Sequence, residues 1–209
     1  MGSEQAPRHP GRPIVAFDFD GTLTVKDSFT AFLAWRTPRP RLISGLLRLT
    51  PAALRYVGDR DRERMKTAAV AEFLAGEAKS RVEADAEAFA EAVWSRFMRP
   101  DALATWHDWG AKGAWRVIVT ASPAVTVAPF AARLGADDLL GTRLAFDAQD
   151  RVAGAFDGPN CRGPEKVARL KAAYGEDVAL AAAYGDSSGD TEMIAMAEVK
   201  GMKAFSGRP

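Results

Sequence analysis

The chain of 209 residues contains a single cysteine, Cys161, so no disulfide can form within it. This scarcity excludes a disulfide-stapled secreted scaffold and is typical of a reducing compartment, so we expect a cytoplasmic protein. A surplus of charge is also missing, because 28 Lys and Arg residues face 27 Asp and Glu residues and leave a formal net charge of +1. This balance argues against a general nucleic-acid-binding role.

Long apolar runs are absent as well. No stretch reaches the roughly 18 apolar residues that a membrane-spanning helix needs, so we predict no integral membrane segment. Residues 1–13 are rich in Pro and Gly and lack the apolar segment of a signal peptide, and we expect a flexible tail there with no functional role. Apolar residues make up 47% of the chain. That content suffices for one buried core, or for one core with a smaller insertion.

The most informative feature is an apolar run from Ile14 that ends in two acidic residues, Asp18 and Asp20, and breaks at Gly21. Such a run is typical of a buried parallel strand. Carboxylates at its end are costly unless a cation or a reaction intermediate balances them. One suitable chemistry is covalent: an Asp attacks a phosphoryl group, and a second Asp serves as general acid and then as general base. The alternative is a strand-to-turn junction in which Asp20 and Gly21 make the turn.

The remaining pattern predicts an α/β protein with a helical insertion. Helix-forming residues dominate from about Asp27 to Pro100, where we expect four helices: one from Ser28 to before Pro38, then 42–57 with a break near Pro51, 61–74 and 80–98. Strands and helices then alternate. We expect a helix through Trp106, a strand over 115–120, a helix over 123–134, a hairpin over 141–156, a helix over 164–174, a strand over 178–184, a helix over 190–197 and a last strand over 202–205.

Polar residues follow three of the predicted strands: Asp18 and Asp20 the first, Thr120 the second and Asp186 the third. In doubly wound α/β domains the carboxyl ends of parallel strands line one crevice, so these residues can meet. After Thr120 a helix with Pro123 at its first position would leave the N–H groups of Ala121 and Ser122 free to hold a phosphoryl group. The alternative is that Ser122 only caps the helix and that Thr120 is an ordinary strand residue.

Two further elements suit a phosphate and a metal. Lys166 lies on the first turn of a predicted helix, where the helix dipole disfavours a cation, so either it is a surface lysine or it serves a phosphoaspartate site that needs a fixed cation. The segment from Gly185 to Asp190 is acidic, rich in glycine and preceded by an apolar strand. Its carboxylates are hard oxygen ligands that suit Mg²⁺, and the alternative is a loop with two turn-forming Asp residues.

Taken together, these residues resemble the four motifs of the haloacid dehalogenase (HAD) superfamily of phosphatases, in the order Asp18-Phe19-Asp20-Gly21-Thr22, Thr120, Lys166 and Gly185 to Asp190. The inserted helices are similar to the C1 cap of subfamily IB, which includes phosphoserine phosphatase. The stretches 120–123 and 160–170 look closer to the branch containing phosphatidylglycerophosphate phosphatase C, and residues 121–123 depart from the Gly-Gly-Phe-like run of phosphoserine phosphatases. The resemblance implies a Rossmann-like parallel sheet core over 14–26 and 100–209, with a helical cap domain over 27–99 inserted after the first strand.

The resemblance also implies an activity, a Mg²⁺-dependent phosphomonoesterase that forms an aspartyl phosphate. Asp18 would be the nucleophile and Asp20 the general acid and base, and the second Asp favours phosphatase over dehalogenase chemistry. Phosphate-binding residues would be Gly21, Thr120, Ala121, Ser122 and Lys166. Mg²⁺ would be held by the Asp18 carboxylate, the Asp20 backbone carbonyl and Asp186, with Asp190 fixing Lys166 or a metal-bound water. Phosphoserine hydrolysis, phosphoryl transfer to another acceptor and a non-enzymatic regulatory module remain as alternatives.

The substrate is predicted only as a small or lipid-linked phosphate monoester, because cap residues choose it. Residues 36–66 carry nine basic residues against three acidic ones. In the same segment, apolar residues at helical spacing suggest an amphipathic element: Leu42, Ile43, Leu46, Leu47, Ala53, Leu54 and Val57. Such an element can lie on an anionic membrane surface. The alternative is that these residues form the core of the cap and that the arginines are solvated.

Overall fold

The computed structural model describes residues 11–59 and 61–209, and its centre is a six-stranded sheet of order β4-β3-β2-β1-β5-β6. Strands β3, β2, β1, β5 and β6 run parallel, while β4 pairs antiparallel with β3. The strands are β1 Ile14–Phe17, β2 Trp115–Pro123, β3 Asp138–Phe146, β4 Val152–Asp157, β5 Leu180–Gly185 and β6 Ala197–Met202. The predicted α/β fold with a largely parallel sheet is confirmed.

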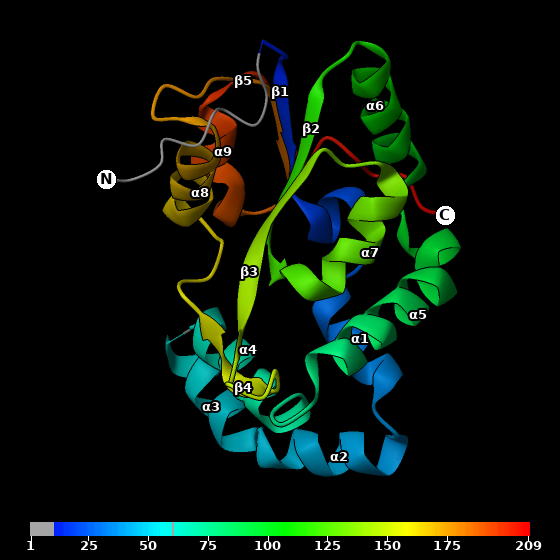
Figure 1. Ribbon diagram of the computed structural model, residues 1–209, viewed down its shortest axis with the longest axis vertical. Helices are drawn as coiled ribbons and strands as arrows, with labels where there is room; N and C mark the ends of the chain where they lie inside the picture. Colours follow the sequence, from blue (N-terminus) through cyan, green and yellow to red (C-terminus); the bar gives the residue numbers. More distant parts are fainter. Residues whose placement is uncertain (1–10, 60) are drawn as a thin grey trace.

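Helices cover both faces of the sheet: α6 Pro100–Ala111 and α7 Ala124–Leu134 lie on one face, and α8 Pro164–Tyr174 and α9 Thr191–Ala195 lie on the other (Figure 1). Successive residues of β1 therefore face different layers. Phe17 belongs to the cluster that contains Trp106 of α6, whereas Ala16 belongs to the cluster that contains Leu170 of α8. This two-sided burial explains why β1 reads as a continuous apolar run.

Within the described residues of 27–99 the structure has five helices where four were predicted: α1 Ser28–Arg36, α2 Arg39–Arg48, α3 Thr50–Asp59, α4 Arg62–Phe73 and α5 Lys79–Phe97. The segment predicted as one broken helix over 42–57 is two helices that meet at Leu49. Pro40 and Pro51 both lie in the first turn of a helix, where a missing N–H group is tolerated, so they begin helices as well as ending them.

Two separate sets of contacts tie the ends of the cap to the body. Near α5, the ring of Phe130 in α7 lies 6.0 Å from the ring of Phe89 and 6.1 Å from that of Trp94. Beyond α4, the backbone pairs with the β3–β4 hairpin: the Gly76 N–H donates to the Val152 carbonyl at 2.8 Å and the Lys79 N–H donates to the Asp150 carbonyl at 2.8 Å. The apolar core is therefore continuous from the cap into the body.

Several of the apolar residues predicted as an amphipathic element point outward. Ile43, Leu46 and Leu47 of α2 are 60%, 54% and 69% exposed, and Leu54 of α3 is 69% exposed. Leu42 and Ala53 are half-buried, and the Val57 side chain lies outside the described part of the chain. The explanation that this face packs inside the cap is thus wrong for the four exposed residues.

Several boundaries differ from the prediction, most clearly those of β2 and β6. Strand β2 continues past Thr120 to Pro123, because Pro123 pairs with Thr142 of β3 after a shift in register, and α7 begins only at Ala124. Strand β6 spans Ala197–Met202 instead of 202–205, because α9 ends at Ala195 and leaves Ala197 free to pair with β5.

The last two residues of the predicted tail, Arg12 and Pro13, contact the body of the protein. The Arg12 guanidinium donates to the carbonyls of Gly113 and Ala114, each at 2.9 Å, and the Pro13 carbonyl accepts from the Trp115 N–H at 2.8 Å. Residues 1–10 of the tail lie outside the described residues. Among the helices of 11–59 and 61–209, none combines the length and the apolar character needed to cross a membrane.

Candidate active site

The polar residues predicted at the strand ends lie at one edge of the sheet. Asp18 directly follows β1, and its N–H donates to the Tyr184 carbonyl of β5 at 2.8 Å. Thr120 belongs to β2 and Asp186 follows β5, and both strands are neighbours of β1. The three side chains line a cavity of about 430 Å³. The crevice at the carboxyl ends of the parallel strands is thus an open pocket.

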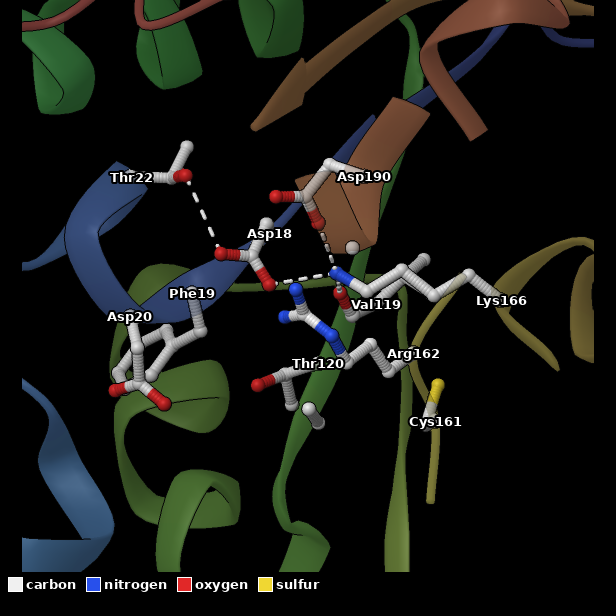
Figure 2. Close-up of polar contacts among 12 residues, drawn as sticks. Asp18, Phe19, Asp20, Thr22, Val119, Thr120, Cys161, Arg162, Lys166 and Asp190 are labelled. Atoms are coloured by element: carbon white, nitrogen blue, oxygen red, sulfur yellow. Dashed lines mark hydrogen bonds and ion pairs between the residues drawn. The ribbon is translucent and has the colours of Figure 1, made fainter. Parts of the chain in front are cut away.

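Lys166 and two carboxylates form the buried centre of this pocket (Figure 2). The Lys166 ammonium donates to Asp18 Oδ1 at 2.6 Å, to Asp190 Oδ1 at 2.7 Å and to the Val119 carbonyl at 2.6 Å. Only 1% of Lys166 is exposed, although it belongs to the first turn of α8. The lysine therefore points inward, and its charge is balanced by two carboxylates instead of by solvent.

Burial and charge act in opposite directions on these groups. Burial raises the pKa of Asp18 to about 7, although the neighbouring Lys166 opposes the rise. Burial alone would lower the pKa of Lys166, but the attraction of Asp18 and Asp190 exceeds that effect and raises it above its ordinary value. The two carboxylates thus favour the charged form of Lys166.

Asp190 orients the lysine. Its Oδ1 accepts from Lys166, while its Oδ2 accepts from the backbone N–H groups of Asp186 and Ser187 and from the Ser187 hydroxyl. Burial would raise the pKa of Asp190, but Lys166 and the hydrogen bonds from Ser187 lower it. Because donors within the protein engage both oxygens, Asp190 holds Lys166 and the 186–190 loop in place.

Asp20 lines the pocket but faces away from Asp18 (Figure 2). Its Oδ1 accepts from the Ser28 N–H at 2.7 Å, and its Oδ2 accepts from the Ser122 hydroxyl. Burial, followed by repulsion from Asp27, raises the pKa of Asp20, while the hydrogen bonds from Ser122 and Ser28 partly offset that rise. A raised pKa favours the protonated acid. Ser28 as a partner of Asp20 was not predicted, and the signal for it is the first free N–H groups of α1.

The predicted phosphate cradle is only partly open. Thr120 is buried beneath the pocket, and its Oγ1 accepts the Ser122 N–H at 3.1 Å. The N–H and the hydroxyl of Ser122 are therefore both engaged within the protein, unlike the free N–H expected from the sequence. Ala121 lines the pocket beside Thr120. The difference arises because this segment continues as strand and does not yet begin a helix.

The acidic residues offer a set of oxygens suited to a divalent cation. Carboxylate oxygens of Asp18, Asp186 and Asp190 lie within 4.8 Å of one another. Protein donors hold both oxygens of Asp190, whereas Asp18 Oδ2 accepts a long hydrogen bond of 3.3 Å from the Thr22 hydroxyl, so Asp18 Oδ2 and the Asp186 carboxylate are the oxygens that a cation could engage most easily. Gly21 has a φ of +79°, and a Cβ there would lie 2.1 Å from Asp186 Oδ2. The glycine thus leaves room for the Asp186 carboxylate, and the hard oxygen donors fit Mg²⁺.

Three basic residues that line the pocket, Lys26, Lys66 and Arg162, were not assigned from the sequence, and the last two make hydrogen bonds across it. Lys66 of α4 reaches over from the cap, and its ammonium donates to the Ala121 carbonyl at 3.2 Å. Burial lowers the pKa of Lys66, although Asp20 and Asp27 oppose the change. Arg162 comes from the loop before α8 and donates to the Ser188 hydroxyl at 3.0 Å. Both residues lie in stretches that the sequence marked, but spacing alone does not show which basic residue faces inward.

Comparison with known proteins agrees with this geometry. The model of the haloacid dehalogenase-like hydrolase family matches residues 15–195. Protein CicA of Caulobacter vibrioides (strain NA1000 / CB15N) is 59% identical over 196 residues, which cover 94% of this chain and 88% of the relative.

Two solved structures share the fold. A protein of unknown function from Bordetella pertussis Tohama I superposes with a TM-score of 0.73 at 24% identity and covers 88% of this chain and 86% of its own. A phospho-aspartyl intermediate analogue of phosphoserine phosphatase superposes with a TM-score of 0.55 at 22% identity and covers 89% of this chain and 83% of its own. With the family model matched across both the sheet and the cap, the chain belongs to the haloacid dehalogenase-like hydrolases.

Proposed function

We propose that the protein is a Mg²⁺-dependent phosphomonoesterase that works through an aspartyl phosphate on Asp18. The observation that carries this proposal is the buried row of Asp18, Lys166 and Asp190 at the base of the pocket. A buried lysine whose ammonium lies 2.6 Å from the Asp18 carboxylate suits a nucleophile that must receive an anionic phosphoryl group, because the positive charge offsets that of the incoming group.

In the first half-reaction, a carboxylate oxygen of Asp18 attacks phosphorus, and the bond between phosphorus and the leaving oxygen breaks. Asp20, whose pKa is raised, gives its proton to that leaving oxygen. To do so its carboxyl group turns from Ser28 and Ser122 toward Asp18. Lys166 and the Thr120 hydroxyl hold the phosphoryl oxygens while negative charge shifts onto them.

In the second half-reaction, Asp20 is ionised and takes a proton from a water molecule. The water oxygen attacks phosphorus, the bond to Asp18 breaks, and inorganic phosphate leaves. Each carboxyl group thereby returns to its starting state. The residues that would hold Mg²⁺ are Asp18, the Asp20 carbonyl and Asp186, and when bound the ion neutralises charge on the phosphoryl oxygens. Gly21 and Ala121 line the wall of the phosphate site, and Ser122 supports it from behind through its hydrogen bonds to Thr120 and Asp20.

We assign residues 14–26 and 100–209 to the core domain and residues 27–99 to the cap domain, which selects the substrate. The substrate class is a small or lipid-linked phosphate monoester. Lys66 and Arg162 support this class, because they place two positive charges on the walls of the pocket, one from the cap and one from the core. A leaving group that carries its own anionic oxygen fits such a pocket better than a neutral alcohol does.

The test compares the parent protein with Asp18→Asn, which keeps the shape of the side chain but removes the nucleophilic carboxylate. Release of phosphate from p-nitrophenyl phosphate in the presence of Mg²⁺ should fall by about 10³-fold or more. Asp147→Asn, a change in the β3–β4 turn, is the matched control and should leave the rate unchanged. Appreciable turnover by Asp18→Asn would refute the covalent mechanism, and intact-protein mass spectrometry of trapped parent enzyme should show phosphate on Asp18.

A further inference from the structure

The outer side of the cap carries an apolar surface that no described residue covers. Ile43, Leu46 and Leu47 stand at helical spacings of three and four on one side of α2, and Leu54 stands on α3. Each is more than half exposed. Helix α2 lies across one end of the long axis of the molecule, with α3 beside it (Figure 1). We call this surface the outer cap face.

The opposite side of α2 is buried against the rest of the cap, in contrast to the outer cap face. Gly45 of α2 lies so close to the ring of Phe73 in α4 that a Cβ at residue 45 would come within 2.4 Å of it. Leu49 is buried. Helix α2 thus satisfies its packing against α4 with one side and leaves the leucines of the other side without a partner.

The charge around the outer cap face is mostly positive: Glu72 of α4 pairs with Arg41 and, at 3.0 Å, with Arg48, and this leaves a surplus of positive charge on the face. From residue 39 to residue 55 the chain carries four arginines and neither Asp nor Glu. Arg39 and Arg48 bracket α2, Arg55 lies next to Leu54, and all three are exposed. Their long side chains can reach past the apolar residues to an anionic surface, as is usual for helices that lie in the interface of a bilayer.

The positive charge helps to decide whether the face is covered by a second copy of the chain or by an anionic bilayer. A second copy of the chain paired about a two-fold axis would set the arginines of one copy against those of the other, with no acidic residue from the same segment to balance them. An anionic bilayer supplies the opposite charge and an apolar interior together. We therefore propose that the outer cap face docks the protein peripherally on membranes that contain anionic lipid. This inference rests on the outer cap face and does not depend on the proposed reaction.

The experiment is co-sedimentation of the full chain with vesicles of phosphatidylcholine alone and with vesicles that also contain phosphatidylglycerol. The parent should sediment with the anionic vesicles, remain in the supernatant with the neutral ones, and be released by added NaCl, because salt screens the arginines. The double variant Leu46→Ser with Leu47→Ser should lower the vesicle partition coefficient by about tenfold or more, because two largely exposed leucines no longer enter the bilayer. The double variant Arg39→Glu with Arg55→Glu should weaken binding to the anionic vesicles, and like the parent it should not bind the neutral ones.

Matched controls lie on exposed sites away from the cap helices α2 and α3. Val199→Ser with Met202→Ser removes comparable apolar side chains from β6, where these residues are 48% and 41% exposed. Arg96→Glu with Lys200→Glu changes the net charge by the same amount as the arginine pair. Both controls should bind like the parent, and Asp18→Asn should also bind while losing hydrolysis, which separates this inference from the proposed function.

Three outcomes would overturn the inference. The first is a parent protein that stays in the supernatant with anionic vesicles at low salt. The second is an equal loss of binding in the controls, which would show that binding depends on net charge or on exposed apolar surface in general and not on the outer cap face. The third is a dimer, detected by sedimentation velocity, that the leucine pair dissociates without any change in vesicle binding, because the face would then belong to a second copy.

Discussion

Replacing Lys166 by Met tests whether the buried charge row of Asp18, Lys166 and Asp190 stabilises the folded protein and its site. Methionine keeps much of the length of lysine but carries no charge, so the variant loses three hydrogen bonds of 2.6 to 2.7 Å and leaves two buried carboxylates facing each other. Removing one partner of a buried ion pair typically costs about 3–5 kcal/mol, and we expect a loss of unfolding free energy in that range. Hydrolysis should fall by about 10²-fold to 10³-fold or more, as it does when one stabilising donor is removed from a transition state.

The pH dependence of this loss has a definite sign. Lys166 lowers the pKa of Asp18, so the variant should raise that pKa above its value of about 7 in the parent. A folded-state pKa above the unfolded value means that stability is lost as the pH rises, so the destabilisation should be larger at about pH 8 than at about pH 5. Urea unfolding followed by tryptophan fluorescence in metal-free buffer measures both quantities.

The double variant Lys166→Met with Asp190→Asn provides the internal control. Neutralising Asp190 removes one of the two unpaired carboxylates, so the double variant should be less destabilised than the sum of the single changes, while hydrolysis should remain lost. If Lys166→Met stays within about 1 kcal/mol of the parent at both pH values, the charge row does not stabilise the fold and the reasoning fails.

Three further predictions follow from single features of the pocket. Asp186→Asn should raise the Mg²⁺ concentration needed for half-maximal activity with little change in thermal stability, and full activity in excess EDTA would reject the metal altogether. Gly21→Ala should abolish hydrolysis, because a Cβ would meet Asp186 Oδ2 at 2.1 Å in a backbone conformation with a φ of +79°, and a kinetic assay with near-normal turnover would contradict this. Cys161 is buried, and burial raises the pKa of its thiol to about 11. Ellman's reagent should therefore react with it only after unfolding, and rapid reaction of the folded protein at about pH 8 would show the site to be open.

The positions of the site residues along the strands were predictable from the sequence, because strand ends in a parallel sheet share an edge. An apolar run followed by Asp18 and an apolar run followed by Asp186 place both carboxylates at that edge without any knowledge of side-chain contacts. The direction in which a side chain turns was not predictable in the same way. Asp20 is held by Ser28 and Ser122, and these contacts depend on where the first cap helix meets the end of β2.

Helical spacing showed that α2 has an apolar side but not whether anything covers it. The side that contains Leu46 and Leu47 is exposed because Gly45 lets α2 approach α4 on the opposite side. Similarly, the basic segment 36–66 did not reveal which of its lysines and arginines would line the pocket, and among those whose side chains the structure describes it is Lys66. Such choices are made by tertiary packing, which the local pattern does not encode.

The two connections between the cap and the body bear on how the molecule unfolds. Phe130 packs against α5, and the backbone at Gly76 and Lys79 is hydrogen-bonded to the β3–β4 hairpin, so neither end of the cap can melt without breaking contacts of the body. We expect one cooperative heat-absorption peak whose van't Hoff and calorimetric enthalpies agree, in spite of the insertion. For the same reason, a rotation of the whole cap about a hinge would have to break contacts at both places.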